Sequence, residues 1–231
     1  MATSPISGSE LEDLKLMAQN HFWPHGKPAG DMSEETGLKT ITSGKGVWLY
    51  DEKDQPWYDA TSCLWLVNLG HGRTEIAQAA YEQMKQISFT PMGSVSPPTA
   101  KLSAKIASVA PDKDSRVFFV SGGAEANETA LKMARKYHIN NGEATRFKVI
   151  SRINSYHGAT HATMSLGGGT RSPHEFEPLM TGSVKIANYD SYRYGFSTKS
   201  EDEASSEYAK DLERAILAHN PSTVSAFIAE P

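Results

Sequence analysis

Apolar and polar residues alternate along this chain with two periods, one typical of helices and one typical of strands. Apolar positions at helical spacing predict amphipathic helices over residues 10–20, 74–87, 99–109 and 204–219. Apolar runs of strand length, rich in β-branched and aromatic residues, predict strands over residues 46–51, 56–60, 117–120, 147–151, 183–187 and 223–229. The first two strands are separated by a short polar stretch with the composition of a hairpin loop, so they are predicted to pair antiparallel.

The second half of the chain follows a strand, helix, strand order. The strand at residues 117–120 ends at Gly122 and Gly123, and a helical pattern starts directly after them and continues to His138. Right-handed crossovers between such strands give an α/β fold, in which a mainly parallel central sheet has helices on both faces. Ligands of these folds bind at the carboxyl ends of the strands, so residues just beyond those ends are the first candidates for a site.

Composition narrows the function classes. The 27 acidic and 23 basic residues give a formal net charge of −4, and the basic residues are scattered among the acids, which argues against a nucleic-acid partner. Cys63 is the single cysteine, so we expect a reducing compartment and interpret Cys63 as a small packed residue. Residues 1–8 lack a signal-peptide pattern and no run is long enough to span a membrane, so the sequence predicts a cytoplasmic protein.

Gly122 and Gly123 stand at the junction of a predicted strand and a predicted helix. The first turn of a helix has unpaired backbone N–H groups and carries the positive end of the helix dipole. Two residues without a Cβ atom let a bulky anion approach these groups closely. The junction is therefore interpreted as a phosphate cradle. The alternative is a tight strand-to-helix connection without a ligand, since such turns are common in α/β proteins.

The loop at residues 152–158 follows the next strand and contains Tyr156, His157 and Gly158. Tyr156 or His157 could stack on a flat ring, so loop and cradle together suggest a phosphorylated ligand with an aromatic ring, although both could be ordinary loop residues. His157 and His161 have metal-ligand spacing, but Gly158 intervenes and no third ligand is evident, so no metal site is predicted. No Walker motif or dinucleotide fingerprint occurs at a strand-to-helix turn, which argues against ATP and NAD.

Four segments, in order along the chain, resemble the landmarks of one protein family. They read LWLVNLGHG at residues 64–72, SGGAEANETALK at 121–132, YHG at 156–158 and AEP at 229–231. These segments and their spacing are similar to those of the class III aminotransferases, over about residues 20–231. The resemblance implies a pyridoxal 5′-phosphate (PLP) enzyme of fold type I. It is strongest to the ω-transaminases, which act on amines, diamines or ω-amino acids, often with pyruvate as the acceptor.

The resemblance assigns roles to residues of this chain. The cofactor-binding residues that it implies are Gly122, Gly123, Ala124, Tyr156, His157, Gly158 and Glu230. Gly123 and Ala124 would hold the cofactor phosphate through backbone N–H groups, and Tyr156 would stack on the pyridine ring. Trp65, which could otherwise be a core tryptophan, would line the amine pocket.

One residue of the cradle departs from the family pattern. The family usually has a serine where this chain has Ala124, so one hydroxyl contact to the phosphate is absent while the backbone donors remain. A neutral hydrogen bond contributes about 0.5–1.5 kcal/mol, and roughly twice that when its partner is charged. The sequence therefore predicts weaker retention of the cofactor.

The family pattern places the catalytic groups after the Glu-Pro pair. These are the aspartate that pairs with the pyridinium nitrogen and the lysine that forms the Schiff base, and the sequence ends at Pro231. Lys132 and Lys136 fall on the helix behind the cradle, and Lys148 and Lys185 are expected to begin strands, at the end away from the site. We therefore expect an N-terminal portion of a longer enzyme, without catalytic residues or the C-terminal part of the fold and inactive by itself.

The expected organisation is an N-terminal arm with part of a small α+β domain over residues 1–73, followed by an incomplete large cofactor-binding domain over residues 74–231. The resemblance implies that the parent protein is a homodimer whose substrates are an amine and a keto acid. Two alternatives stay open. One is another class III enzyme, such as an aminomutase, a decarboxylating aminotransferase or a racemase. The other is a non-catalytic fragment that binds a phosphorylated ligand or a partner subunit.

Overall fold

The computed structural model describes residues 6, 8–26, 39–168, 173–190, 192 and 200–230. Internal contacts divide the chain into two compact units, Met1–Ala100 and Lys101–Pro231, and each unit is described by itself. This division falls inside a helix, and the domain boundary at residues 73/74 stays a prediction. The final Pro231 of the Glu-Pro pair lies outside the described residues.

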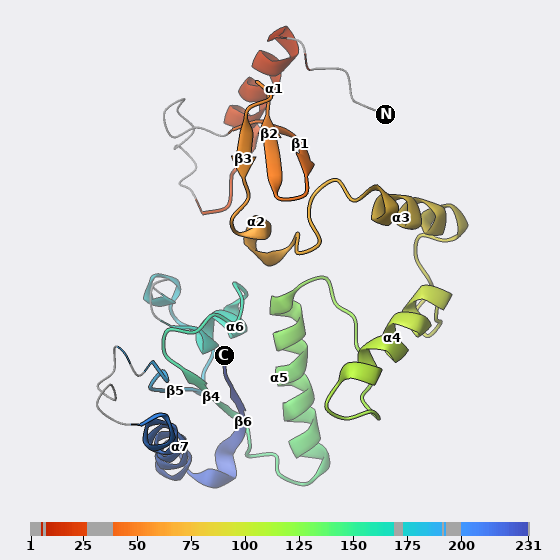
Figure 1. Cartoon of the computed structure of the whole chain (residues 1–231). Coiled ribbons are helices and arrows are strands. Elements are labelled where there is room, and N and C mark those ends of the chain that lie inside the picture. The colour runs from red at the N-terminus through yellow and green to blue at the C-terminus, as the bar shows by residue number, and fades with distance from the viewer. Residues whose placement is uncertain are drawn as a thin grey trace. The chain divides into compact units, whose positions relative to one another are not determined.

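The first unit is built on a small antiparallel sheet (Figure 1). Its elements are α1 (Gly8–His21), β1 (Ile41–Lys45), β2 (Trp48–Asp51), β3 (Pro56–Tyr58), α2 (Ser62–Trp65), α3 (Thr74–Gln86) and the beginning of α4 (Pro97–Val109). The strands pair in the order β1-β2-β3. The predicted helices at 10–20, 74–87 and 99–109 are thereby confirmed, with ends shifted by one or two residues.

The predicted hairpin is confirmed, and one side chain explains its turn. Asp51, the last residue of β2, accepts hydrogen bonds from the backbone N–H groups of Lys53 and Gln55, each at 2.9 Å. It also accepts one from the indole Nε1 of Trp57 in β3, at 2.9 Å. Strand β1 was missed by the hydrophobic pattern, because Ile41 is the only large apolar residue among its five residues. Pairing with β2, rather than burial, makes this segment a strand.

The second unit has a parallel sheet in the strand order β5-β4-β6. Its elements are α5 (Gly123–Asn140), β4 (Lys148–Arg152), α6 (His161–Leu166), a 3₁₀ turn at Pro173–Phe176, β5 (Ser183–Ile186), α7 (Glu201–Ala218), a 3₁₀ turn at Pro221–Thr223 and β6 (Val224–Ile228). The central strand β4 pairs parallel with both neighbours. The predicted α/β fold with a parallel sheet is confirmed.

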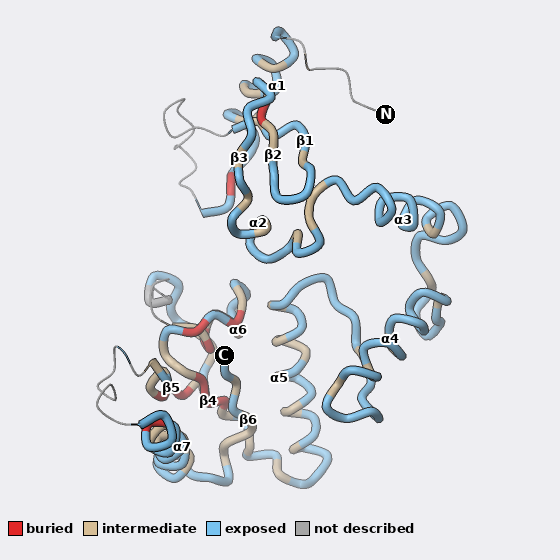
Figure 2. Tube along the Cα trace, viewed as in Figure 1, coloured by how far each residue is buried: buried red, intermediate tan, exposed pale blue. Residues whose placement is uncertain are grey.

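Helices cover both faces of this sheet. Buried Ile150 of β4 packs with Val184 and Ile186 of β5, and Leu212 and Ile216 of α7 lie against them. The side chain next to Ile150 along β4, Val149, points to the opposite face and lines a pocket together with residues of α5 and α6. Most of the buried residues of the second unit lie on β4, β5, α6 and the loop between β4 and α6 (Figure 2).

The predicted strand at residues 117–120 does not form. Residues 115–120 have no regular secondary structure, and the large side chains there are exposed, Phe118 by 71% and Phe119 by 45%. A strand needs a neighbour whose N–H and C=O groups complete a ladder, and β4, β5 and β6 pair only among themselves. The apolar run therefore has the composition of a buried strand, but no strand among the described residues pairs with it.

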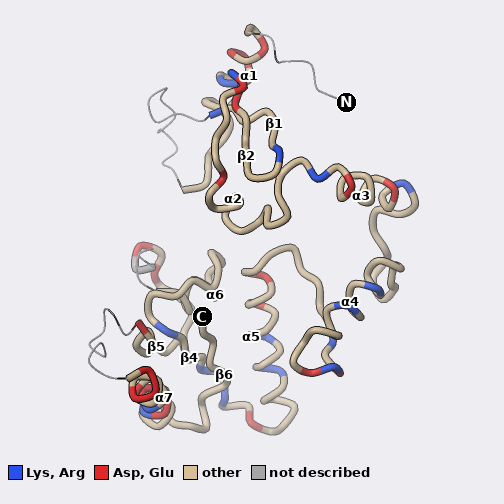
Figure 3. Tube along the Cα trace, in the orientation of Figure 1, with Lys and Arg blue, Asp and Glu red and all other residues tan. Residues whose placement is uncertain are grey.

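Helix α7 begins at Glu201, three residues before the predicted start, because Ser200 caps it. The Ser200 hydroxyl accepts a hydrogen bond from the backbone N–H of Glu203, whose carboxylate accepts one from the backbone N–H of Ser200. Glu201, Asp202 and Glu203 make the first turn acidic (Figure 3), which is favourable at the positive end of the helix dipole. Among the residues that the structure describes, no helix is long and apolar enough to cross a membrane.

Candidate functional site

The N-terminus of α5 is open, as the phosphate cradle requires. Gly122 is the N-cap residue, its backbone is extended, and it provides no side chain to cap the helix. A Cβ atom added at Gly122 or Gly123 would meet nothing within 4 Å. The free N–H groups at the beginning of this 18-residue helix, with Gly123 and Ala124 as its first two residues, therefore face open space that an anion can fill.

The loop after β4 lies against the first turn of α5. Gly158 has a φ of +134°, a conformation that L side chains rarely adopt. A Cβ atom at this position would lie 2.8 Å from the Cβ of Ala124 and 2.6 Å from Oγ1 of Thr163. A glycine is needed at position 158 because the loop backbone passes so close to the cradle. The structure thus brings together two segments that are more than thirty residues apart in the sequence.

The residues after β6 hold the same loop from the other side. The backbone N–H of Tyr156 donates a hydrogen bond to the Glu230 carboxylate at 2.7 Å. Glu230 follows the last residue of β6 by two positions, and β6 pairs parallel with β4, so both strands end at the same edge of the sheet. Glu230 therefore anchors the loop that carries Tyr156, whose side chain is 47% exposed.

Asn127 and Glu128 contribute contacts to the site that the sequence pattern did not predict. The amide Nδ2 of Asn127 donates a hydrogen bond to the backbone carbonyl of His157 at 2.7 Å. The Thr160 hydroxyl donates one to the Glu128 carboxylate at 2.7 Å. Each of these two hydrogen bonds joins a side chain in the first turns of α5 to a residue of the segment after β4. The sequence could have indicated them, because they follow Gly123 by about one helical turn and therefore lie close to the cradle on the same helix.

His157 is the buried titratable group of this site. Its residue is 6% exposed, and its Nε2 atom has no hydrogen-bond partner among the described residues. Burial lowers the pKa of His157, the positive charge of Lys185 lowers it further, and the Glu230 carboxylate acts in the opposite direction. The imidazole is therefore neutral at neutral pH, with an unpaired polar atom inside the site.

Lys185 corrects one sequence expectation. It is the third of four residues of β5 and not its beginning, so it lies toward the carboxyl end of the strand. Its Nζ donates a hydrogen bond to the Ser151 hydroxyl at 2.9 Å, and partial burial lowers its pKa to about 8. Lys148, in contrast, is the first residue of β4, as expected, and its Nζ donates to the carbonyl of His219.

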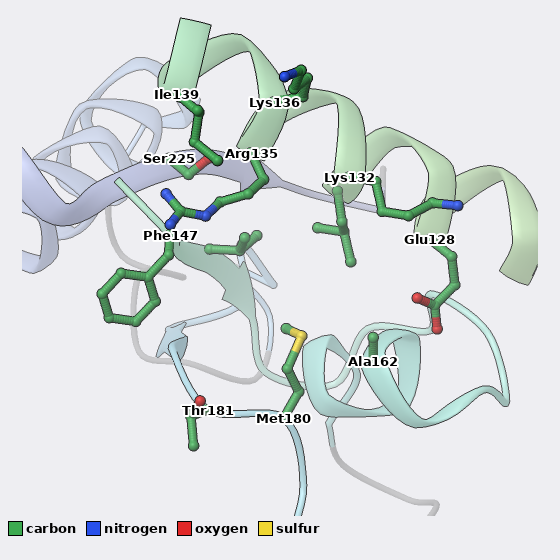
Figure 4. Close-up of a pocket in the computed structure, with 12 residues that line it drawn as sticks. Glu128, Lys132, Arg135, Lys136, Ile139, Phe147, Ala162, Met180, Thr181 and Ser225 are labelled. Atoms are coloured by element: carbon green, nitrogen blue, oxygen red, sulfur yellow. The ribbon is translucent and has the colours of Figure 1, made fainter. Parts of the chain in front are cut away.

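A pocket of about 400 Å³ lies beside α5 (Figure 4), and the cradle residues Gly122, Gly123 and Ala124 do not line it. Its apolar walls include Leu131, Phe147 and Met180, and Lys132 and Lys136 stand at its border. None of the predicted cofactor-binding residues lines it. The two lysines therefore lie along α5 behind its first turn, and Glu128 is the residue that this pocket shares with the candidate site.

Trp65 and Cys63 belong to the first unit. Trp65 is 75% exposed, so it is not a core tryptophan, and its role in an amine pocket stays a prediction. Cys63 is also exposed, which makes its interpretation as a packed residue wrong. The reason is local: residues Ser62 to Trp65 all have positive φ values, between 49° and 67°, so Cys63 lies in an exposed left-handed turn and not in a packed strand or helix.

Comparison with known proteins identifies the family. A family model described as aminotransferase class-III matches residues 30–231. A putrescine–pyruvate aminotransferase of Pseudomonas aeruginosa is 36% identical over 99% of this chain and 50% of its own length. A diaminobutyrate–2-oxoglutarate transaminase of Halomonas elongata is 36% identical over 84% of this chain and 42% of its own length. The chain thus spans about half the length of the curated relatives it matches.

A solved structure agrees with the fold. The crystal structure of an (S)-enantioselective ω-transaminase from Thermomicrobium roseum has a TM-score of 0.86 and 33% identity, over 94% of this chain and 48% of its own. The predicted fold type and the predicted family are both confirmed by these similarities. A matching family model over most of its residues and a matching tertiary structure place this chain in the class III aminotransferases.

Proposed function

We propose that the full-length protein containing this chain is a PLP-dependent aminotransferase. It would move an amino group from an amine, a diamine or an ω-amino acid to a keto acid such as pyruvate. The observation that carries the proposal is the convergence of three segments: Gly158 packs on Ala124, and Glu230 binds the backbone of Tyr156. The names of the relatives, which include a diamine donor with pyruvate and a diamino acid with 2-oxoglutarate, support the substrate classes.

The cradle fits a phosphate monoester. Gly123 and Ala124 would bind it with the backbone N–H groups at the open end of α5, where the helix dipole favours negative charge. The space in front of Gly122 and Gly123 leaves room for the phosphate oxygens, since a Cβ atom at either position would meet no other atom within 4 Å. Ala124 contributes a methyl group where a serine would add a hydroxyl donor.

The loop after β4 fits the ring of the same cofactor. Tyr156 would present the face of its phenol ring to the pyridine ring, while Glu230 holds the backbone below it. His157 offers a neutral imidazole whose Nε2 has no partner among the described residues, so it can bind a polar group of the cofactor. Bound PLP supplies an electron sink that weakens the C–H bond next to the amine nitrogen. These residues of the chain bind and orient it.

The lysine that binds the cofactor covalently is proposed to lie in the half of the relatives' length that this chain does not span. Lys132 and Lys136 border a different pocket, and Lys148 donates to a carbonyl at the opposite end of β4. Lys185 lies toward the carboxyl end of β5, where its Nζ donates to the Ser151 hydroxyl. Trp65 is proposed to line the amine pocket, since the residue is 75% exposed and its indole is available for an apolar contact.

The test uses the full-length protein with added PLP. We expect a visible absorbance band of protein-bound cofactor that borohydride removes, together with formation of alanine from pyruvate when putrescine is the donor. A band without amino transfer from any amine would indicate another class III enzyme, such as a racemase or an aminomutase. Absence of both the band and the activity would overturn the proposal and leave a protein without this chemistry.

A further inference from the structure

Three side chains with metal-binding atoms meet in the first unit, and none of them is a predicted cofactor-binding residue. They are Asp59 after β3, Cys63 in the left-handed turn and His71 in the segment before α3. The Nε2 atom of His71 lies 2.8 Å from Oδ2 of Asp59, and Sγ of Cys63 lies 3.4 Å from the same oxygen. The sulfur and Nε2 are 4.0 Å apart. A thiol, an imidazole and a carboxylate therefore converge on one point.

The backbone around this cluster fixes all three side chains. The N–H of Cys63 donates to the other oxygen of Asp59, Oδ1, at 2.9 Å, so the turn and the carboxylate hold each other. His71 exchanges two backbone hydrogen bonds with Gly46, at 2.8 and 3.0 Å. Its ring lies over Gly44, where a Cβ atom would come within 2.8 Å of the His71 Cβ. The arrangement is thus built by the sheet and the turn together.

We propose that Asp59, Cys63 and His71 form a binding site for Zn²⁺ or a similar soft divalent cation. Thiolate, imidazole and carboxylate are the ligands that zinc takes in proteins, at bond lengths of about 2.0–2.3 Å. Tetrahedral coordination at those lengths separates the donor atoms by about 3.3–3.7 Å. The three observed separations of 2.8, 3.4 and 4.0 Å span this range, so side-chain shifts of a few tenths of an ångström complete the site.

Burial and charge suit such an ion. The side chains of Asp59 and His71 are 7% and 15% exposed, whereas Cys63 is exposed, so a fourth position can take a water molecule. The thiol and the imidazole N–H now share one carboxylate oxygen as their acceptor. On binding, the thiol proton passes to solvent and the His71 proton moves from Nε2 to Nδ1. One thiolate and one carboxylate then balance the two charges of the cation.

A nucleophilic role for Cys63 fits the same contacts less well. The surrounding protein and the Asp59 carboxylate raise the pKa of the Cys63 thiol. An activated thiol needs a cation or a free base beside it, and here the imidazole is engaged with Asp59. Trp65 follows Cys63 by two residues in the same turn, so the cation would also stiffen the segment that carries this tryptophan.

The site is tested by zinc binding to the full-length protein, measured by competition with a chromophoric chelator. We expect one equivalent of Zn²⁺ that binds at least tenfold more weakly in Cys63→Ser and in His71→Asn. His21→Asn, which changes an exposed histidine of the same unit, is the matched control and should leave the affinity unchanged. X-ray absorption of the bound zinc should show one sulfur neighbour, which the Cys63→Ser variant lacks.

Other results of these measurements would overturn the site. Zinc binding that is unchanged in Cys63→Ser, or a zinc spectrum without sulfur in the unmodified protein, would place the ion elsewhere. Failure of the unmodified protein to take up zinc would reject the proposal outright. Circular dichroism of each variant shows whether it is folded, and Cys63→Ala provides a second thiol deletion if Cys63→Ser is not. None of these readouts depends on the proposed aminotransferase activity.

Discussion

Tyr156 is anchored through its backbone, so a substitution of its side chain tests what the ring contributes to PLP binding while the loop stays in place. The N–H of Tyr156 binds Glu230, so Tyr156→Ala removes the ring and leaves this hydrogen bond in place. An aromatic contact contributes about 0.5–1.5 kcal/mol, which corresponds to roughly 2- to 13-fold weaker PLP binding. Fluorescence titration of the full-length protein with PLP measures the change. Tyr156→Phe should bind like the unmodified protein, and equal affinity of the alanine variant would contradict the stacking role.

Ala124 offers a gain-of-function test at the same site. Ala124→Ser places a hydroxyl at the second residue of α5, where it can donate to the cofactor phosphate. A hydrogen bond to a charged group contributes about 1.5–3 kcal/mol, so we expect PLP to dissociate roughly 10- to 150-fold more slowly. Dialysis against cofactor-free buffer measures the rate. Ala130→Ser, an exposed position on the same helix, is the control, and faster loss from Ala124→Ser would contradict the cradle.

His157 predicts a pH dependence. Its pKa is lowered in the folded protein by burial and by Lys185, whereas the unfolded chain takes up a proton near the ordinary value of 6.5. The unfolded state therefore binds more protons below about pH 6.5, and stability falls as the pH drops from there toward the folded pKa. Denaturant unfolding between about pH 5 and 8 measures this slope. His157→Asn should flatten the slope, and an unchanged slope would contradict the assignment.

A substitution of Lys185 provides a second test of the pH dependence that His157 gives to the stability of the folded protein. Lys185→Met removes the positive charge that helps to lower the pKa of His157, while the burial of the imidazole remains. The folded pKa should therefore move closer to that of the unfolded chain, and the stability loss at low pH should become smaller. An equal or larger loss in Lys185→Met would show that this charge does not act on His157.

At the scale of elements, the hairpin of the first unit depends on one carboxylate. Asp51 binds the N–H groups of Lys53 and Gln55 and the indole of Trp57. Asp51→Ala leaves these donors without their acceptor, so we expect the amide of Gln55 to exchange its hydrogen about tenfold faster. Hydrogen exchange of the full-length protein measures this. Lys53→Ala, which shortens an exposed side chain of the same turn, is the comparison, and equal exchange in both variants would contradict the role of Asp51.

Elements also show where the hydrophobic pattern succeeds and where it fails. The pattern located the five longer helices α1, α3, α4, α5 and α7, because a helix makes its backbone hydrogen bonds internally and its apolar spacing is therefore a local signal. It failed for β1, which has little apolar content, and for residues 117–120, which have much. In both cases the decision depends on whether another segment lies alongside, and that information is not local.

At the scale of the whole molecule, we propose that the connector between α3 and α4 is a contact surface of the full-length protein. Phe89, Met92 and Val95 are exposed by 86%, 102% and 65%, and apolar groups gathered in one loop are typical of subunit interfaces. We expect the full-length protein to sediment as a dimer and Met92→Glu to shift it toward the monomer. Analytical ultracentrifugation over a range of concentrations measures both. A monomer at all concentrations would contradict this surface as a dimer interface.

The sequence by itself determined the fold class and the family, and it predicted which residues form the cofactor site. These follow from local information: the helical and strand periods, the two glycines at a strand-to-helix junction, and four short segments in a fixed order. Their roles in binding PLP stay predictions until a cofactor is measured. The sequence also misplaced Lys185 relative to its strand and took Cys63 for a packed residue.

Only the tertiary structure decided which of these residues meet. Gly158 packs on Ala124, Glu230 holds Tyr156, and Asn127 holds the carbonyl of His157. These contacts arise because parallel strands β4 and β6 end at one edge of the sheet, where α5 begins nearby. The convergence of Asp59, Cys63 and His71 is of the same kind, since a left-handed turn and two backbone hydrogen bonds to Gly46 produce it. Side-chain proximity across such distances in sequence depends on backbone geometry, which no local pattern encodes.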